Sequence, residues 1–452
     1  MRFLLEDTSR RAIRYLDGLN QRNVAPTPES VSGLDRLPVD LAEESNDPND
    51  VIAELDNVVS PATMAMAGPR FFGLVIGGSL PAALAANWLA GAWDQNSSIY
   101  DLTPGTARLE ELALRWLISI FRLPQNCGGA FVTGDTLANF SALAAARHAV
   151  LAREGWNVES EGLIGAPEIR VVVGAEAHVS LFKCLGMLGL GRNKVIKVPV
   201  DKQGRMRADS LPTLSRNTIV CTQAGNVNTG AFDPTGEICL RAHDAGAWVH
   251  VDGAFGLWAA AAPSRAYLAE GVERADSWAT DAHKWLNVPY DSGLAFVRDG
   301  EALRAAMAVS AEYLPISKTH RDPSDYAPEL SRRARGVEVW AALRSLGRSG
   351  LADLIERTCR YARRFAEGLR EAGYEVLNEV VLNQVLVSFG DADATKRIIA
   401  ELQAEGTCWC GGSVWQGHTA MRISVSSWAT TDADVEKSLT AMLRIAAKNC
   451  KR

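Results

Sequence analysis

The stretches HVDGAFG, residues 250–256, and DAHKWLNVPYDSG, residues 281–293, decide the fold. The first places Asp252 at the end of an apolar run, and the second places Lys284 just after the next apolar run. Such runs predict buried parallel strands, and in open α/β sheets the carboxyl ends of the strands line the ligand crevice. We therefore expect an acid and an amine to meet in one cleft, although an ordinary structural ion pair would have the same pattern.

Seven short apolar runs extend this pattern along the chain. Most are continuously apolar rather than alternating, as strands covered on both faces require, and helical or turn-rich segments separate them. The sequence therefore predicts an α/β fold with a mostly parallel sheet of about seven strands. The candidate strands are AFVT (130–133), RVVVG (170–174), VIKVP (195–199), TIVCT (218–222), AWVHVD (247–252), DSWAT (276–280) and GLAFV (293–297).

The chain is expected to have three parts. Residues 1–60 form an N-terminal arm, with a helix near residues 10–19 and a loop in the Pro-rich stretch at residues 25–40. Residues 61–310 form the large α/β domain. Residues 311–452 begin with a mobile polar loop and continue with a long helix and a small α+β domain.

Composition excludes several classes of protein. The 452 residues are 47% hydrophobic and 22% charged, as in ordinary soluble globular chains. The net charge is −6 and no long cluster of Lys and Arg is present, so nucleic acid is not an expected partner. The longest apolar stretch, residues 80–93, is shorter than the ~20 residues of a membrane span, and the N-terminus lacks the apolar core of a signal peptide. We expect a soluble, cytoplasmic protein that does not bind membranes.

The eight cysteines are scattered, without a CxxC pair or a histidine at zinc-ligand spacing. Buried free thiols in a reducing compartment are the expected state. Cys408 and Cys410 lie two residues apart, but a third ligand is missing, so no metal site is predicted.

Three further segments follow predicted strands and reach the same edge of the sheet. TGDTLAN, residues 133–139, opens an Ala- and Leu-rich helix, whose first N–H groups suit a phosphate. His178 follows the strand at 170–174, and Asn226 follows the strand at 218–222. Each is weak evidence alone. Together, a phosphate site, a partner for a flat ring, a carboxylate and an amine match the needs of pyridoxal 5′-phosphate (PLP).

The order and wording of these segments resemble the PLP-dependent group II amino-acid decarboxylases, the family of the aromatic amino-acid and glutamate decarboxylases, in a bacterial-type member. The resemblance runs from about Gly68 to Thr431, and HVDGA together with HKWL carries most of it. It implies the PLP-dependent transferase fold (fold type I), an L-amino acid as substrate, and a homodimer with active sites at its interface.

The implied reaction is decarboxylation to the corresponding amine and CO2. A PLP-dependent carbon–carbon lyase or an aldehyde-forming enzyme is the alternative on the same core. A non-catalytic PLP-binding protein is a third possibility, disfavoured because the lysine, the aspartate and the histidine are all present.

The resemblance also implies residue roles. Lys284 would form a Schiff base with the cofactor aldehyde, and Asp252 would pair with the ring nitrogen so that the ring can accept electrons. His178 would stack on one ring face and Ala254 would pack against the other. These roles require the four side chains to share one site.

Contacts with the phosphate and the ring substituents are implied for a second group of residues. Because Asp135 departs from the family wording, it would place a carboxylate beside a phosphate, which is repulsive unless the side chain points away. The implied residues are Asp135, Thr136, Asn226, Asp281 and His283.

Tyr326, in the polar stretch 314–328, is the candidate acid that returns a proton to Cα. His178 and Lys284 are its competitors, and an exposed loop tyrosine without a catalytic role is the alternative. A loop that closes over the site would exclude water.

The substrate pocket is implied in the stretch GPRFFG and near residue 100 of a second chain. Phe71, Phe72 and Tyr100 would suit an aliphatic or aromatic side chain, whereas Arg70 would suit an acidic one. Alternatively, Phe71 and Phe72 are packed core rings. Arg422 is either a structural arginine or a clamp for the substrate carboxylate.

Overall fold

The structure is a computed structural model that describes residues 1–309 and 319–449. The chain forms two compact units. The small unit comprises residues 1–78, 361–377 and those from 385 onward, and the large unit comprises residues 79–360 and 378–384. The grouping thus joins the N-terminal residues with the C-terminal region. The predicted parts 1–60, 61–310 and 311–452 are drawn along the chain and stay a prediction.

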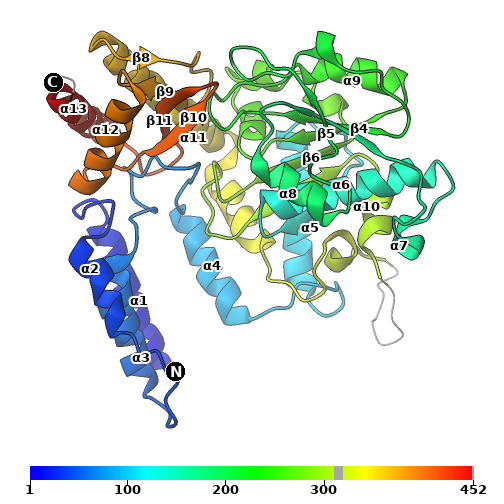
Figure 1. Ribbon diagram of the computed structural model, residues 1–452. Coiled ribbons are helices and arrows are strands. Elements are labelled where there is room, and N and C mark those ends of the chain that lie inside the picture. The colour runs from blue at the N-terminus through cyan, green and yellow to red at the C-terminus, as the bar shows by residue number, and fades with distance from the viewer. Residues whose placement is uncertain (310–318, 450–452) are drawn as a thin grey trace. The chain divides into compact units, whose positions relative to one another are not determined.

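A seven-stranded sheet forms the centre of the large unit. Its strands are β1 (Gly128–Val132), β2 (Arg170–Gly174), β3 (Ile196–Val198), β4 (Thr218–Gln223), β5 (Trp248–Asp252), β6 (Ser277–Asp281) and β7 (Gly293–Val297). Their order is β1-β7-β6-β5-β4-β2-β3. Figure 1 labels β4, β5 and β6 of this sheet. β2 pairs in parallel with β3 and β4, β4 with β5, and β5 with β6, while β7 runs antiparallel to β6 and β1. All seven predicted strands are confirmed.

Helices cover this sheet, which explains the continuous apolar runs. Every residue of β4, β5, β6 and β7 is buried, and a core cluster packs residues of α6 and α8 against β2 and β4. The helices of the large unit are α4 (Pro81–Trp93), α5 (Pro104–Ile120), α6 (Asp135–Ala152), α7 (Val158–Glu161), α8 (Val179–Met187), α9 (Thr235–Asp244), α10 (Gly300–Met307) and the first part of α11 (Gly336–Glu371).

One close backbone approach positions the start of α6. A Cβ atom on Gly293, the first residue of β7, would lie 2.5 Å from the Cα atom of Gly134, so only glycine fits there. The contact joins the β6–β7 connection to the residue that precedes α6. The N-terminus of α6 and the carboxyl end of β6 are therefore held side by side.

The small unit combines helices with a four-stranded sheet of order β10-β11-β9-β8. Its elements are α1 (Arg2–Gly18), α2 (Pro28–Ser32), α3 (Pro48–Glu54), β8 (Glu375–Val376), β9 (Gln384–Ser388), α12 (Ala392–Glu405), β10 (Gly411–Trp415), β11 (His418–Ser424) and α13 (Asp432–Asn449). The predicted long helix is α11, which is broken at Gly347, a residue with a φ of 60°. The small α+β region predicted from the sequence is present.

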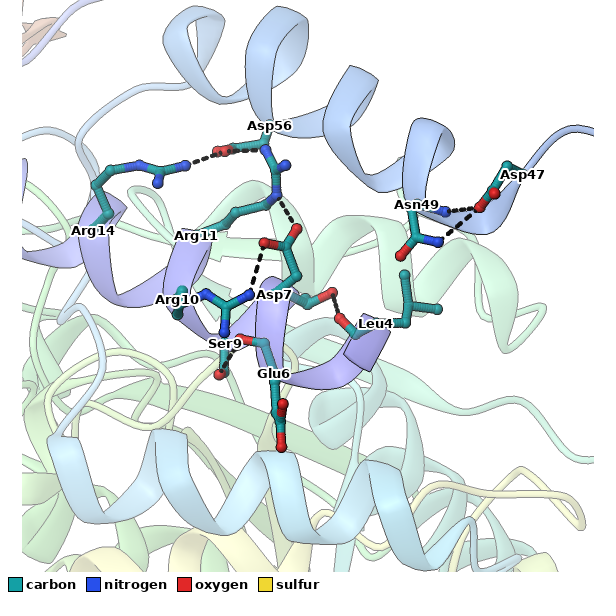
Figure 2. A network of polar contacts seen from close by, with 11 residues as sticks. Leu4, Glu6, Asp7, Ser9, Arg10, Arg11, Arg14, Asp47, Asn49 and Asp56 are labelled. Carbon is teal, nitrogen blue, oxygen red and sulfur yellow. Dashed lines mark hydrogen bonds and ion pairs between the residues drawn. The ribbon is translucent and has the colours of Figure 1, made fainter. Parts of the chain in front are cut away.

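Ion pairs fasten α1 to the segment at residues 55–59 (Figure 2). Arg11 contacts Asp7 at 2.6 Å and Asp56 at 2.9 Å, and Arg14 contacts Asp56 at 2.7 Å. The helix predicted near residues 10–19 is therefore part of a longer helix, α1, which ion pairs join to the segment at residues 55–59.

The loop predicted at residues 25–40 is wrong in part, because α2 and a 3₁₀ turn, η1 (Gly33–Arg36), lie within it. Thr27 caps α2 by accepting a hydrogen bond from the Ser30 N–H group, and Pro28 occupies its first turn. Proline and hydroxyl residues begin helices as readily as they form turns, so composition alone was a poor guide here.

Within the described residues, no helix has both the length and the apolar character needed to cross a membrane. The seven cysteines in this part of the chain are free thiols, and all are buried except the half-buried Cys127.

A buried ion triad ties the segment before α11 to α5. Glu110 on α5 lies 2.8 Å from the Arg332 guanidinium and 3.0 Å from that of Arg321. Arg332 is fully buried, and it also donates hydrogen bonds to the carbonyl oxygens of Ser97 and Phe131. The carboxylate therefore neutralises a guanidinium that has no access to water.

We expect Glu110→Ala to lower the free energy of unfolding by about 3–5 kcal/mol, because it leaves the Arg332 charge buried without its partner. Urea denaturation followed by circular dichroism measures this change. Glu111→Ala, on the same helix, is the matched control, because Glu111 pairs with the exposed Arg115 and should cost about 0–1 kcal/mol. Equal losses in the two variants would contradict the importance of the triad.

Candidate active site

The carboxyl end of β6 provides a buried ion pair. Asp281 is the last residue of the strand, and its Oδ2 atom lies 2.8 Å from the Nζ atom of Lys284. Burial alone would lower the pKa of Lys284, but the nearby carboxylate of Asp281 raises it above its ordinary value. Lys284 is therefore held as an ammonium ion in the protein without cofactor.

The neighbouring strand, β5, ends at the buried Asp252. Its Oδ1 atom accepts a hydrogen bond of 3.3 Å from the Ala254 N–H group. Its buried Oδ2 atom has no hydrogen-bond partner among the described residues. Burial raises the pKa of Asp252, and the nearby side chains of His178 and Lys284 oppose this rise. A buried carboxylate oxygen without a partner is suited to a charged N–H group of a ligand.

The N-terminus of α6 lies beside the β6 end of the site. A Cβ atom on Gly134 would lie 3.3 Å from the ring of His283 and 3.7 Å from Asp281. The His283 Nδ1 atom accepts a hydrogen bond from the Ser292 N–H group at 3.1 Å, and its ring stacks on Tyr290 at 4.2 Å. Burial lowers the pKa of His283. Tyr290 was not predicted as a site residue, and its position in the stretch 281–293 was the one sequence signal for it.

His178 follows β2 and caps α8. Its Nδ1 atom accepts a hydrogen bond from the backbone N–H group of Ser180 at 3.3 Å and lies 2.7 Å from the Ser180 hydroxyl. His178 is close enough to Asp252 to lower the pKa of that carboxyl. The imidazole, the carboxylate and the lysine thus belong to one site.

The remaining predicted cofactor residues lie at the same edge of the sheet. Thr136 is half-buried in the first turn of α6. The Ala254 carbonyl accepts a hydrogen bond from the Asp281 N–H group at 2.9 Å, which joins the ends of β5 and β6. The Asn226 side chain accepts hydrogen bonds from the N–H groups of Asn228 and Thr229, so it holds the turn after β4.

This donor set fits PLP. A helix N-terminus provides N–H groups for a phosphate. Asp252 provides an unpartnered buried oxygen for a ring N–H group, and Lys284 provides the amine for an aldehyde. Among the residues that the structure describes, no group of three or more His, Cys, Asp or Glu could hold a metal ion.

Tyr326 lies in a 3₁₀ turn, η8 (Pro323–Tyr326). Its ring packs against the apolar cluster that includes Ala138 and Ala327, and the Arg321 guanidinium lies 4.2 Å from the ring centroid. Tyr326 is therefore fastened to the large unit. Residues 314–318 of the loop predicted around it lie outside the described residues, and its role as an acid stays a prediction.

Arg70 is buried, and all of its guanidinium nitrogen atoms have protein partners. It donates to the Thr407 carbonyl at 2.8 Å and the Asn20 carbonyl at 3.1 Å, and it pairs with Asp434 at 3.1 Å. These contacts give Arg70 a structural role that sequence analysis did not foresee. A role in recognising an acidic substrate stays a prediction that these contacts do not support.

The other predicted substrate residues lie in aromatic pairs. Phe71 stacks on Trp409 with ring centroids 5.1 Å apart, and the fully buried Phe72 packs edge-on against Phe365. These placements match the alternative interpretation of the two rings as core. Tyr100, in the large unit, stacks on His320 at 3.8 Å. Arg422 lies half-buried on β11, and burial lowers its pKa.

Comparison with known proteins identifies the family. Residues 30–390 match the family model described as the pyridoxal-dependent decarboxylase conserved domain. The chain is 24% identical over 458 residues to the aromatic-L-amino-acid decarboxylase of Bacillus atrophaeus. The match covers 96% of this chain and 92% of the relative. It is 30% identical over 381 residues to the L-2,4-diaminobutyrate decarboxylase of Rhizobium meliloti (strain 1021). This match covers 80% of this chain and 74% of the relative.

The fold has a close structural match as well. The match is to a crystal structure of Oryza sativa TDC with PLP and tryptamine, which is 23% identical in sequence and has a TM-score of 0.90. The superposition covers 99% of this chain and 97% of the other chain. The chain belongs to the pyridoxal-dependent decarboxylase family. It is a PLP-dependent carboxy-lyase with the fold type I architecture, as the sequence predicts.

We expect Asp281→Asn to move the pH profile of cofactor capture by the protein without PLP to lower pH. Asp281 raises the pKa of Lys284, and only the neutral amine attacks an aldehyde, so its removal increases the neutral fraction at a given pH. The absorbance of bound PLP, recorded from neutral to alkaline pH, measures the capture rate. The control Asp244→Asn, an exposed residue of α9, should leave the profile in place. A profile that is unchanged or moves to higher pH in Asp281→Asn would show that Asp281 does not raise the pKa of Lys284.

Proposed function

We propose that this protein decarboxylates a non-acidic L-amino acid to its amine and CO2, with Lys284 holding PLP as a Schiff base. The observation that carries the proposal is the buried Asp252 Oδ2 atom without a partner, next to the Lys284–Asp281 ion pair. Both features occur at the ends of adjacent parallel strands, where ligands of open α/β sheets bind.

When bound, PLP supplies the electron sink that accepts the electron pair left at Cα as CO2 departs. Asp252 favours the protonated ring nitrogen, because a carboxylate nearby stabilises the cationic form. His178, held by its cap on α8, would fix the ring plane so that the breaking bond is aligned. Tyr326, His178 and Lys284 are the candidates for the acid that protonates Cα.

The substrate class follows from Arg70. An acidic side chain needs a cation, and the guanidinium predicted for this purpose is bound to two carbonyl groups and Asp434. The relatives' names are divided, since one acts on aromatic amino acids, another on 2,4-diaminobutyrate and others on acidic amino acids. The proposed substrate class therefore rests on the contacts of Arg70.

A homodimer in a reducing compartment such as the cytoplasm completes the proposal. On α4, the large apolar side chains of Trp88, Leu89 and Trp93 are 44%, 54% and 44% exposed. Exposed apolar groups of this size on one short helix favour a protein interface. The free cysteines favour a reducing environment.

We expect the purified, PLP-loaded protein to release CO2, with an equal amount of amine, from one non-acidic class of amino acids. The panel contains the common amino acids, ornithine, 2,4-diaminobutyrate, cysteine sulfinate and dihydroxyphenylalanine. Asp252→Ala should lower the turnover number by about a hundredfold or more, because it removes a fixed electrostatic contact, whereas Asp244→Ala should not. Release from acidic amino acids alone would refute the substrate class. Aldehyde with ammonia, or a retro-aldol fragment, would refute decarboxylation to an amine.

A further inference from the structure

A buried chain of polar side chains leads from the core of the sheet to His178 through Asp135. Ser277, His250 and Asn139 are fully buried, and Asp135 and Trp248 are nearly so. The successive contacts are Trp248 Nε1 to Ser277 Oγ at 2.9 Å, Ser277 Oγ to His250 Nδ1 at 2.9 Å, His250 Nε2 to Asn139 Oδ1 at 2.7 Å, Asn139 Nδ2 to Asp135 Oδ2 at 2.9 Å, Asp135 Oδ2 to Ser180 Oγ at 3.2 Å and Ser180 Oγ to His178 Nδ1 at 2.7 Å.

In the first part of this series of hydrogen bonds, the direction of donation starts from Trp248. An indole N–H group only donates, so Ser277 accepts from Trp248 and its own hydroxyl proton is available to His250 Nδ1. Burial lowers the pKa of His250 to about 3, so its ring is neutral. Its Nε2 atom lies 2.7 Å from the Asn139 carbonyl oxygen, which only accepts, so the single ring proton lies on Nε2. His250 Nε2–H therefore donates to the Asn139 carbonyl oxygen, and the Asn139 amide N–H donates to Asp135 Oδ2.

In the second part of the series, His178 determines which groups donate and which accept. Its Nδ1 atom accepts a hydrogen bond from the backbone N–H group of Ser180, so it carries no proton. The Ser180 hydroxyl, 2.7 Å from the same Nδ1 atom, must then donate to it. The single hydroxyl proton is used, and the contact of 3.2 Å between Ser180 Oγ and Asp135 Oδ2 needs a proton from the carboxyl group.

We propose that Asp135 is an un-ionised carboxylic acid that donates to Ser180 and thereby positions His178, with Nδ1 of the imidazole as acceptor. Asp135 and Ser180 are positioning residues, because they act on the cofactor through His178. The proposal rests on the proposed function only where it says that His178 acts on the cofactor. The proton assignment itself follows from hydrogen bonds within the protein.

Two observations support the neutral form. The Asp135 Oδ1 atom is buried without a hydrogen-bond partner among the described residues, which costs far less for a neutral acid than for a carboxylate. Burial and the carboxylates of Asp252 and Asp281 raise the pKa of Asp135 well above its ordinary value, against the opposing effects of Lys284 and of the hydrogen bond with Ser180. A phosphate at the N-terminus of α6 would raise this pKa further.

The neutral form also explains why a family member can have an aspartate in its phosphate loop. An ionised Asp135 would repel the phosphate, whereas an un-ionised one would not. The proton on Asp135 thus allows the same residue to begin α6 and to hold His178.

Infrared spectroscopy of the protein, with and without PLP, tests the protonation state. We expect a carbonyl band of an un-ionised carboxyl group at neutral pH that is lost in Asp135→Asn and kept in the surface control Asp244→Asn. The affinity for PLP should change less than about threefold in Asp135→Asn, since no charge is removed. Absence of the band, or tightening by about tenfold or more as expected when a like charge beside the phosphate is removed, would overturn the proposal.

A second variant, Ser180→Ala, tests the positioning and covers the case in which Asp135→Asn does not fold. We expect the carboxyl band to persist at a shifted frequency, and the 15N signal of His178 Nδ1 to move in histidine-labelled protein. An unchanged band together with an unchanged His178 signal would overturn the proposal. Neither readout depends on turnover, so a failure here is distinct from a failure of the decarboxylase assignment.

Discussion

The contact of 2.8 Å between Lys284 and Asp281 is the interaction around which the site is arranged. An ammonium ion in the interior is stable only with a partner, and β6 supplies that partner as its last residue. The close approach of Gly293 to Gly134 then brings the N-terminus of α6 beside the pair, and the pairing of β5 with β6 brings Asp252. Amine, carboxylate and anion site therefore meet because of strand order, not because they are close in sequence.

The parts of the molecule that the sequence predicts are those with local patterns. The strands are continuously apolar because helices cover them, and the residues that follow parallel strands share an edge. Contacts between distant segments have no such pattern. Arg70 and Asp434 are 364 residues apart, and Phe71 contacts Trp409, which is also distant in sequence, so these partners were not predicted. The short helix at residues 28–32 was missed because its capping residues are also turn residues.

The protonation states at the site depend on burial as much as on residue type. Asp135 appears in the sequence as a negative charge in a phosphate loop, and only its buried surroundings show how that charge is avoided. The His250–Asn139 contact spans 111 residues and links the motif HVDGA to TGDTLAN. The two motifs thus belong to one hydrogen-bonded system that ends at His178.

Borohydride reduction of the PLP-loaded protein, followed by peptide mapping, tests whether Lys284 is the residue that binds PLP. We expect one reduced cofactor per chain, attached to the peptide that contains Lys284, and no attachment in Lys284→Ala. A reduced cofactor on another lysine, or undiminished attachment in Lys284→Ala, would contradict it.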